Sequence, residues 1–177
     1  MPENEPPIST GRGDDGTTTM LGAGRMPKHD ARIEALGDID EASSALGVAR
    51  AEAANSSEEL AQLLLDMQRL LYRVMGDLAM PREDNFVGSS DVELVDSALT
   101  EWKSRTRLPE EFVVPGESRL GSLLDVSRSV VRRAERRLVA AGLASDSPDA
   151  LRAVNRLSDL LFVVARNADG HNEPSRG

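Results

Sequence analysis

Residues 120–139 read LGSLLDVSRSVVRRAERRLV and repeat small or apolar residues at the period of an α-helix. In steps of three and four residues, one row on this helix is mostly apolar: Leu120, Leu124, Ser127, Val131, Ala134 and Leu138. A row of this kind predicts a helix that packs against other helices. The rest of the chain should therefore supply the helices that cover it.

A second row runs one step around the same helix and is mostly polar: Gly121, Asp125, Arg128, Arg132, Glu135 and Val139. Because this row borders the apolar one, we expect its charges to be partly desolvated. Two interpretations stay open from this helix alone. The charges could form ordinary surface ion pairs, or they could form a functional surface.

The composition favours one helical domain over residues 1–177. The chain has 177 residues, 40% of them hydrophobic, with only three Phe, one Tyr and one Trp, so Leu, Val, Ala and Met must fill the core. The net charge of -9 argues against nucleic acid or an anionic membrane as a partner. The absence of cysteine excludes thiolate chemistry. No apolar run approaches about 18 residues, so we expect a soluble, cytoplasmic protein.

Helical periodicity recurs in four other segments. The predicted helices cover residues 30–54, 57–79, 91–104, 120–141 and 148–169. No strand pattern or internal repeat interrupts them, which predicts an all-α fold, a five-helix antiparallel bundle. Tails 1–8 and 170–177 are rich in Pro, Gly and charge, and we expect both to be disordered.

Three positions outside the apolar rows could carry function. Asp40 lies one step from the apolar row of the first helix, where an unpaired carboxylate would be costly, so it needs a cationic partner. Residues 9–19, STGRGDDGTTT, form a segment that we expect to hold no regular element. This segment could bind an anion through backbone N–H groups and a hard cation through oxygens, or it could be a flexible linker. Phe112 lies in an apolar patch that is either a loop anchor or a functional group.

Three blocks of the sequence together resemble one family. The first is T-x-x-G-D-x-G-T-T at residues 10–18, followed by RMPKHDARIEALGDIDEASSALG. The second is FVVPG at residues 112–116, followed by a helix containing RSVVRRAERR, and the third is VNRLSDLLFVVARNA at residues 154–168. In this order they resemble the PduO-type ATP:cob(I)alamin adenosyltransferases.

The resemblance implies an activity and an assembly. Such an enzyme moves the 5′-deoxyadenosyl group of ATP to the cobalt of cob(I)alamin, releasing triphosphate, with Mg²⁺ accompanying the nucleotide. The family fold is a five-helix bundle that forms a homotrimer with active sites between subunits. A corrinoid reductase and an adenosylcobalamin-dependent enzyme are the partners to expect.

The resemblance also implies residue roles. Asp40 and Arg128 match an ion pair across the subunit interface and, with Arg132, are the expected catalytic residues. Phe112 matches the aromatic at the lower face of the corrin, where it displaces the base ligand. No metal ligand is assigned. The implied ATP-binding residues are Thr10, Gly11, Arg12, Gly13, Asp14, Asp15, Gly16, Thr17, Thr18, Thr19, Lys28, Arg132, Arg133, Glu135, Arg136 and Asn155.

The chain departs from the family pattern in places, and other functions stay open. Gly11 stands where a basic residue is common, with the base moved to Arg12, and Glu117 follows a Pro-Gly pair where small residues are usual. The alternative function is a non-catalytic carrier or sensor that binds ATP and corrinoid in the same bundle. A scaffold that uses its polar rows only for trimer contacts is a third possibility.

Overall fold

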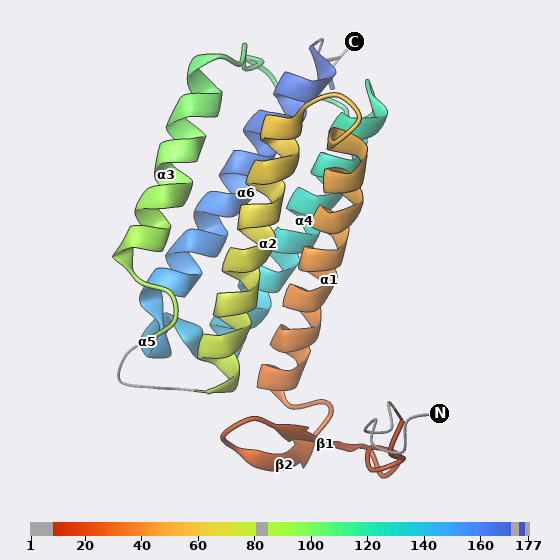
Figure 1. The fold of residues 1–177 in the computed structure, drawn as a ribbon, viewed down its shortest axis with the longest axis vertical. Coiled ribbons are helices and arrows are strands. Elements are labelled where there is room, and N and C mark those ends of the chain that lie inside the picture. Colours follow the sequence, from red (N-terminus) through yellow and green to blue (C-terminus); the bar gives the residue numbers. More distant parts are fainter. Residues whose placement is uncertain (1–8, 81–84, 171–173, 176–177) are drawn as a thin grey trace, which may run out of the picture.

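The computed structural model describes residues 9–80, 85–170 and 174–175. A short hairpin of β1 (Thr17–Met20) and β2 (Gly24–Pro27) precedes the helices. The helices follow in the order α1 (Ala31–Ala53), α2 (Glu58–Ala79), α3 (Ser89–Ser104), α4 (Arg119–Ala140), α5 (Leu143–Asp146) and α6 (Pro148–Asp169). The five long helices run side by side as a bundle, which confirms the predicted fold class (Figure 1).

The helix predicted over residues 120–141 lies between two neighbours in this bundle. As α4, it packs against α1 on one side and α6 on the other, while α2 packs on α1 and α3 on α6. Leu124, Ser127, Val131, Ala134 and Leu138 of its apolar row are buried. The row predicted from the sequence is therefore the side of α4 that faces the core.

Alanine allows α1 to pack closely on its neighbours. Its buried row is Ala35, Ile39, Ala42, Leu46, Ala49 and Ala53, which is the row that helical spacing predicts. Small side chains bring helix axes close together and strengthen dispersion contacts. Ser57 and Ser118 cap α2 and α4 by accepting hydrogen bonds from Leu60 and Gly121 backbone N–H groups.

Two expectations about regular structure were wrong. Residues 9–19 were expected to hold no regular element, yet Thr17 begins β1, which pairs antiparallel with β2 from Thr17–Pro27 to Met20–Gly24. Gly22 and Gly24 adopt positive φ in the turn, a conformation that favours glycine. Residues 142–147 also lie outside the predicted helices, yet Leu143–Asp146 form the single-turn α5, which begins directly after its N-cap Gly142.

The expected tails have different outcomes. Residues 1–8 lie outside the described residues. Within 170–177, Pro174 forms an isolated antiparallel bridge with Val113, and the Ser175 N–H donates to the Phe112 carbonyl at 2.8 Å. This part of the C-terminal tail is therefore paired with the loop between α3 and α4. No helix in the described ranges is both long and apolar enough to span a bilayer.

Candidate active site

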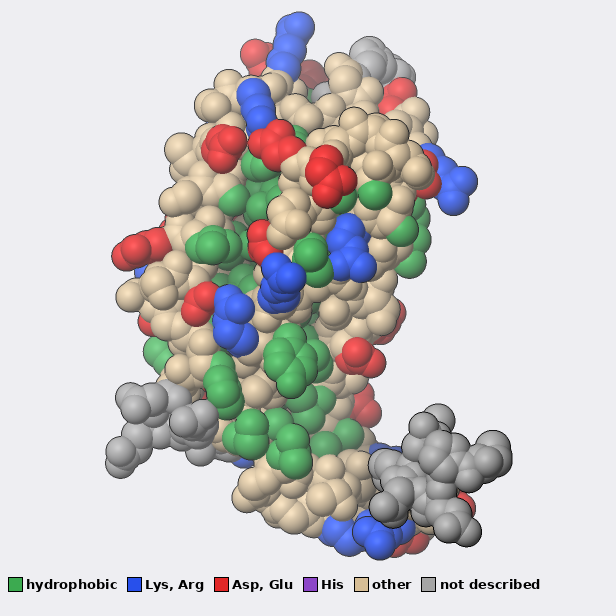
Figure 2. Space-filling model, in the orientation of Figure 1, with side chains coloured by type: hydrophobic (Ala, Val, Ile, Leu, Met, Phe, Trp, Pro, Cys, Tyr) green, Lys and Arg blue, Asp and Glu red, His purple; other side chains and the backbone are tan. Residues whose placement is uncertain are grey.

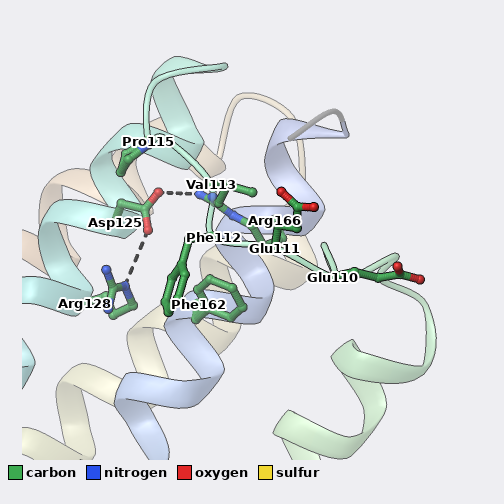
Figure 3. Close-up of a pocket in the computed structure, with 9 residues that line it drawn as sticks. All are labelled: Glu110, Glu111, Phe112, Val113, Pro115, Asp125, Arg128, Phe162 and Arg166. Atoms are coloured by element: carbon green, nitrogen blue, oxygen red, sulfur yellow. Dashed lines mark hydrogen bonds and ion pairs between the residues drawn. The ribbon is translucent and has the colours of Figure 1, made fainter. Parts of the chain in front are cut away.

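Phe112 projects from the loop between α3 and α4 over a pocket at one end of the bundle (Figure 3). Phe112 is 86% exposed, so this residue does not anchor the loop in the single chain. The ring lies beside Phe162 of α6 in the close-up. The pocket has a volume of about 390 Å³ and is lined by Glu110, Glu111, Phe112, Val113, Pro115, Asp125, Arg128, Phe162 and Arg166.

Charged side chains from α4 and α6 form the inner wall of this pocket. Arg166 is buried and donates to the Asp125 carboxylate, and the same guanidinium nitrogen lies 3.0 Å from Asp169. Arg128 Nε lies 3.5 Å from the other Asp125 oxygen. Sequence reasoning missed Arg166, although an arginine directly after the apolar run 160–165 is a signal that a buried carboxylate faces it.

The loop before β1 is held together by Asp15. Its Oδ1 accepts hydrogen bonds from the Thr17 N–H at 2.9 Å and the Thr17 hydroxyl at 2.7 Å, and its carboxylate pairs with Arg25. These hydrogen bonds from Thr17, together with the charge of Arg25, hold the pKa of the Asp15 carboxyl below its ordinary value. Asp15 is therefore an ionised acceptor within the loop.

Only part of the loop backbone is free to meet an anion. The N–H groups of Asp14 and Gly16 donate to carbonyls within the loop, and that of Arg12 donates to the Thr10 hydroxyl. Together with the bonded Thr17 N–H, four amides are already used. The remaining amides and the side chains of the loop are therefore the groups that an anion could meet.

Lys28 lies against this loop. Its N–H donates to the Gly16 carbonyl at 3.0 Å, and its Nζ lies 3.2 Å from the position that a Cβ on Gly13 would take. The lack of a side chain on Gly13 thus leaves room for the ammonium group. The hairpin thus brings together the glycine-rich loop and Lys28, which the family resemblance assigns to ATP binding.

The arginines of α4 divide into two kinds. Arg132 and Arg136 are exposed, and Arg136 Nη1 donates to the Arg132 carbonyl at 2.8 Å. Arg133 instead pairs with Asp38 at 3.3 Å and with Glu41, both on α1, and the hydrogen bond that it donates to the Glu41 carboxylate raises the pKa of its guanidinium. Arg133 therefore joins α4 to α1 in addition to any contact with a ligand.

Glu135 and Asn155 meet across two helices. The Asn155 Nδ2 of α6 donates to Glu135 Oε1 of α4 at 2.8 Å. Both residues are half-buried, so this hydrogen bond fixes the two side chains next to the exposed arginines. The structure brings together these two residues that the resemblance assigns to ATP binding.

Asp40 lies in a separate groove. It is exposed, and it shares an apolar groove of about 720 Å³ with Thr18 and Thr19 of β1 and with parts of α1 and α2. Figure 2 shows hydrophobic side chains gathered on this face, above the hairpin. The desolvation expected for Asp40 is not found in the single chain. Within the described ranges, its carboxylate has no ion pair or hydrogen bond.

The candidate residues form two groups in one chain. The loop, Lys28 and Asp40 lie at the hairpin end of α1, whereas Arg128, Arg132, Glu135 and Asn155 lie along α4 and α6. Among the residues that the structure describes, no hydrogen bond or ion pair connects the two groups.

Comparison with known proteins identifies the class to which this helical bundle belongs. The family model described as cobalamin adenosyltransferase matches residues 8–168. A corrinoid adenosyltransferase from Citrobacter freundii is 37% identical over 165 residues, covering 90% of this chain and 93% of that protein. Another, from Mycobacterium leprae, is 38% identical over 181 residues, covering 94% and 93%. The chain therefore belongs to the cobalamin adenosyltransferase family.

The solved structures narrow this class. A variant PduO-type ATP:corrinoid adenosyltransferase from Lactobacillus reuteri, complexed with cobalamin and ATP, superposes with a TM-score of 0.88 at 29% identity, covering 97% of this chain and all of that chain. A second variant from the same organism, complexed with ATP, gives a TM-score of 0.86 at 28% identity. Within the family, this chain is of the PduO type.

Proposed function

We propose that this protein transfers the 5′-deoxyadenosyl group of ATP to the cobalt of cob(I)alamin, forming adenosylcobalamin and triphosphate. The observation that carries the proposal is the 86% exposed Phe112 over a pocket with two arginines in its wall, in a chain that matches corrinoid adenosyltransferases over most of its length. Phe112 and Phe162 line the same pocket, so the exposed ring is part of a larger apolar surface that a ligand or partner could cover. The flat, largely apolar face of a corrin is a suitable ligand.

The chemistry needs positioning more than proton transfer. The Co(I) centre supplies an electron pair to C5′ of the ribose, a Co–C bond forms, and the C5′–O bond breaks with its electron pair leaving on the triphosphate. The protein must hold the two reactants in line and stabilise the growing negative charge. Cationic side chains that are free of internal ion pairs suit the second task.

Arg132 and Arg136 fit that task because their guanidiniums are exposed and, within the described residues, have no carboxylate partner. We assign them to the polyphosphate, together with Lys28 and Arg12 from the N-terminal loop. The Glu135–Asn155 pair is proposed to hydrogen-bond the nucleoside. Arg133 contributes by joining α4 to α1, next to Arg128. The remaining proposed nucleotide contacts are the loop residues Thr10, Gly11, Gly13, Asp14, Asp15, Gly16, Thr17, Thr18 and Thr19.

A homotrimer with sites between subunits would unite the two groups of residues. Among the described residues of one chain, no hydrogen bond or ion pair links the loop or Asp40 to Arg128, Arg132 or Arg136, so each site would take the first group from one subunit and the second from its neighbour. In that assembly Asp40 would meet Arg128 of the adjacent copy. Asp40 is exposed and has no ion pair among the residues that the structure describes, and this, together with the apolar groove around it, supports the arrangement.

Mg²⁺ is proposed to enter with ATP. No cluster of three or more His, Asp or Glu side chains that could hold a metal is found in the described ranges, so the phosphates themselves would supply most of the ligands, as is usual for this ion. Asp14 and the Thr18 hydroxyl are the protein oxygens best suited to complete the set, because Asp15 is already bonded to Thr17 and Arg25. The ion would neutralise part of the phosphate charge.

The proposed reaction also implies partners. Cob(I)alamin is formed by one-electron reduction of cob(II)alamin, so a corrinoid reductase must act before this enzyme. An adenosylcobalamin-dependent enzyme must take up the product.

The test is an anaerobic assay with chemically reduced cobalamin, ATP and Mg²⁺, in which the visible spectrum follows conversion of cob(I)alamin to adenosylcobalamin. We expect conversion that depends on both enzyme and ATP. Binding of ATP and corrinoid without conversion would favour the non-catalytic carrier. An absence of any ATP-dependent shift in unfolding temperature would favour the scaffold.

A further inference from the structure

Four charged side chains run in a line from the end of α6 to the Phe112 pocket. We propose that Asp169, Arg166 and Asp125 hold Arg128 and the Phe112 loop in one fixed relation for corrinoid binding. In this proposal Arg166 and Asp169 are positioning residues. The corrinoid contacts neither Asp169 nor Ser118, and these residues act on it through the groups that they hold in place. This inference rests on the proposed function and adds to it the residues that shape the corrinoid side of the site.

The four side chains of this line depend on one another for their positions, because three of them are buried and their charges alternate in sign. The side chains of Asp169 and Arg166 are 0% and 1% exposed, and that of Asp125 is 7% exposed. Arg166 Nη2 contacts both carboxylates. The second oxygen of Asp125, Oδ1, lies 3.5 Å from Arg128 Nε. The signs alternate from Asp169 to Arg128. Each buried charge would be expensive alone, so the loss of one member changes the position of the others.

The far end of the line holds the base of the loop. Asp169 Oδ1 accepts hydrogen bonds from the Ser118 N–H at 3.1 Å and from the Ser118 hydroxyl at 2.7 Å. Ser118 directly follows the loop and is the N-cap of α4, where its Oγ also accepts from the Gly121 N–H at 2.9 Å. Asp169 thereby fixes the point at which the loop enters α4.

Gly121 shows that the fold makes room for this carboxylate. A Cβ at position 121 would lie 1.9 Å from Asp169 Oδ1 and 2.5 Å from its Cγ, which no packing allows. Glycine is a poor helix former compared with alanine, so the close approach of Asp169 explains its presence in the first turn of α4.

The near end of the line faces the pocket. Asp125, Arg128 and Arg166 line the same cavity as Phe112, and the guanidinium carbon of Arg166 lies 5.6 Å from the centre of the Phe162 ring (Figure 3). At one end, the line of charged residues forms part of the cavity wall. At the other end, Asp169 holds the Phe112 loop through Ser118. A change at Asp169 should affect corrinoid binding while leaving the nucleotide residues in place.

Gly121→Ala tests the inference because the new methyl group would displace the Asp169 carboxylate without altering any residue that lines the pocket. The matched control is Gly47→Ala in α1, where a Cβ would lie 3.2 Å from the end of the flexible Gln68 side chain. The measurements are the Kd for cob(II)alamin by difference absorbance, the KM values for corrinoid and ATP, and thermal unfolding. In Gly121→Ala, we expect the corrinoid Kd and KM to rise at least about fivefold, with the ATP KM within about twofold of the parent.

Asp169→Asn is the second variant and decides the question if Gly121→Ala does not fold. It keeps the volume and one acceptor oxygen but removes the charge opposite Arg166, so the corrinoid constants should again rise with the ATP KM unchanged. Corrinoid constants equal to those of Gly47→Ala would overturn the inference. So would a parallel loss of ATP and corrinoid binding, because that pattern indicates only a structural role.

The parent protein separates this inference from the proposed function. A parent that binds cob(II)alamin but makes no adenosylcobalamin would contradict the proposed function alone, and the Kd values would still decide the role of Asp169. A parent that binds no corrinoid would contradict both.

Discussion

Arg132 is the residue on which the proposed charge stabilisation depends most directly. Its exposed guanidinium has no carboxylate partner among the described residues, unlike Arg133, which pairs with Asp38 and Glu41. A cation kept free of internal pairs can bind an anionic ligand without first breaking a contact. We therefore propose different roles for these two adjacent arginines: Arg132 binds the polyphosphate, and Arg133 joins α4 to α1.

Arg132→Ala should reduce kcat at least about 100-fold, because charge would then accumulate on the departing triphosphate without its donor. The fold should be unchanged, since no internal contact of the side chain is lost. Steady-state kinetics with cob(I)alamin, together with circular dichroism, measure both effects. Arg119→Ala on the same helix is the matched control and should keep parental kcat; an Arg132→Ala enzyme with parental kcat would refute the assignment.

Phe112→Ala should bind ATP normally but slow the reaction that starts from cob(II)alamin, by about tenfold or more, because the ring would no longer displace the lower ligand of cobalt. The measurement is the rate of adenosylcobalamin formation from cob(II)alamin with a reductant, beside the KM for ATP. Val114→Ala in the same loop is the control. Equal rates for Phe112→Ala and the parent would exclude the lower-face role.

At this scale the sequence could predict exposed functional residues better than buried ones. Phe112, Arg132 and the Glu135–Asn155 pair belong to motifs that a family resemblance carries. Arg166 lies within the third block and Asp169 directly follows it, but neither received a role, because periodicity describes apolar rows and gives no partner for a buried charge. Their pairing depends on the close approach of α4 and α6, which only the packed structure fixes.

The β1–β2 hairpin stabilises the conformation of the N-terminal loop. Thr17 is both the first residue of β1 and the donor of two hydrogen bonds to Asp15, so strand and loop stabilise each other. Sequence reasoning grouped the threonines with the glycine-rich loop and missed the strand. β-branched residues such as Thr17–Thr19 do favour strands, but Gly and Pro in the partner segment concealed the pairing.

Asp15→Asn should raise the KM for ATP at least about threefold with little effect on the corrinoid KM, because a neutral amide accepts more weakly from Thr17 and Arg25. In the parent, the pKa of the Asp15 carboxyl lies below its ordinary value. Its stabilising effect is therefore present above that ordinary value and is lost only as the pH falls through the lowered pKa.

The matching pH measurement is the parental KM for ATP from about pH 8 to about pH 5, where this carboxyl should cause no rise. Asp66→Asn on α2, which removes a carboxylate outside this loop, is the control and should keep the parental KM for ATP. A loss of ATP binding in the parent near pH 5 that disappears in Asp15→Asn would contradict the role given to Asp15.

At the scale of the whole molecule, the proposed homotrimer would give a role to the surface around Asp40. The apolar groove around Asp40, and a carboxylate with no hydrogen bond or ion pair among the described residues, support the proposed contact with a neighbouring copy. The helical core, by contrast, was predictable from the sequence, since the structure buries the apolar row of α1 and all of the apolar row of α4 except Leu120. Periodicity identifies what faces inward but not which exposed face meets another subunit.

Asp40→Asn should weaken both assembly and the use of corrinoid, because the proposed pair with Arg128 of the adjacent copy would lose its charge attraction. Light scattering after size exclusion measures the oligomer, and the corrinoid KM measures the site. Glu93→Gln on the exposed side of α3 is the control. A stable trimer with parental kinetics in Asp40→Asn would make the pair incidental.

The central claim is that the adenosyl group itself is transferred, and product stoichiometry tests it most directly. In an anaerobic reaction with cob(I)alamin, ATP and Mg²⁺, chromatography would measure adenosylcobalamin and phosphorus NMR would measure triphosphate. Transfer from C5′ predicts the two products in equal amounts, with neither appearing when corrinoid is omitted. Formation of ADP and phosphate, or triphosphate without adenosylcobalamin, would contradict the account.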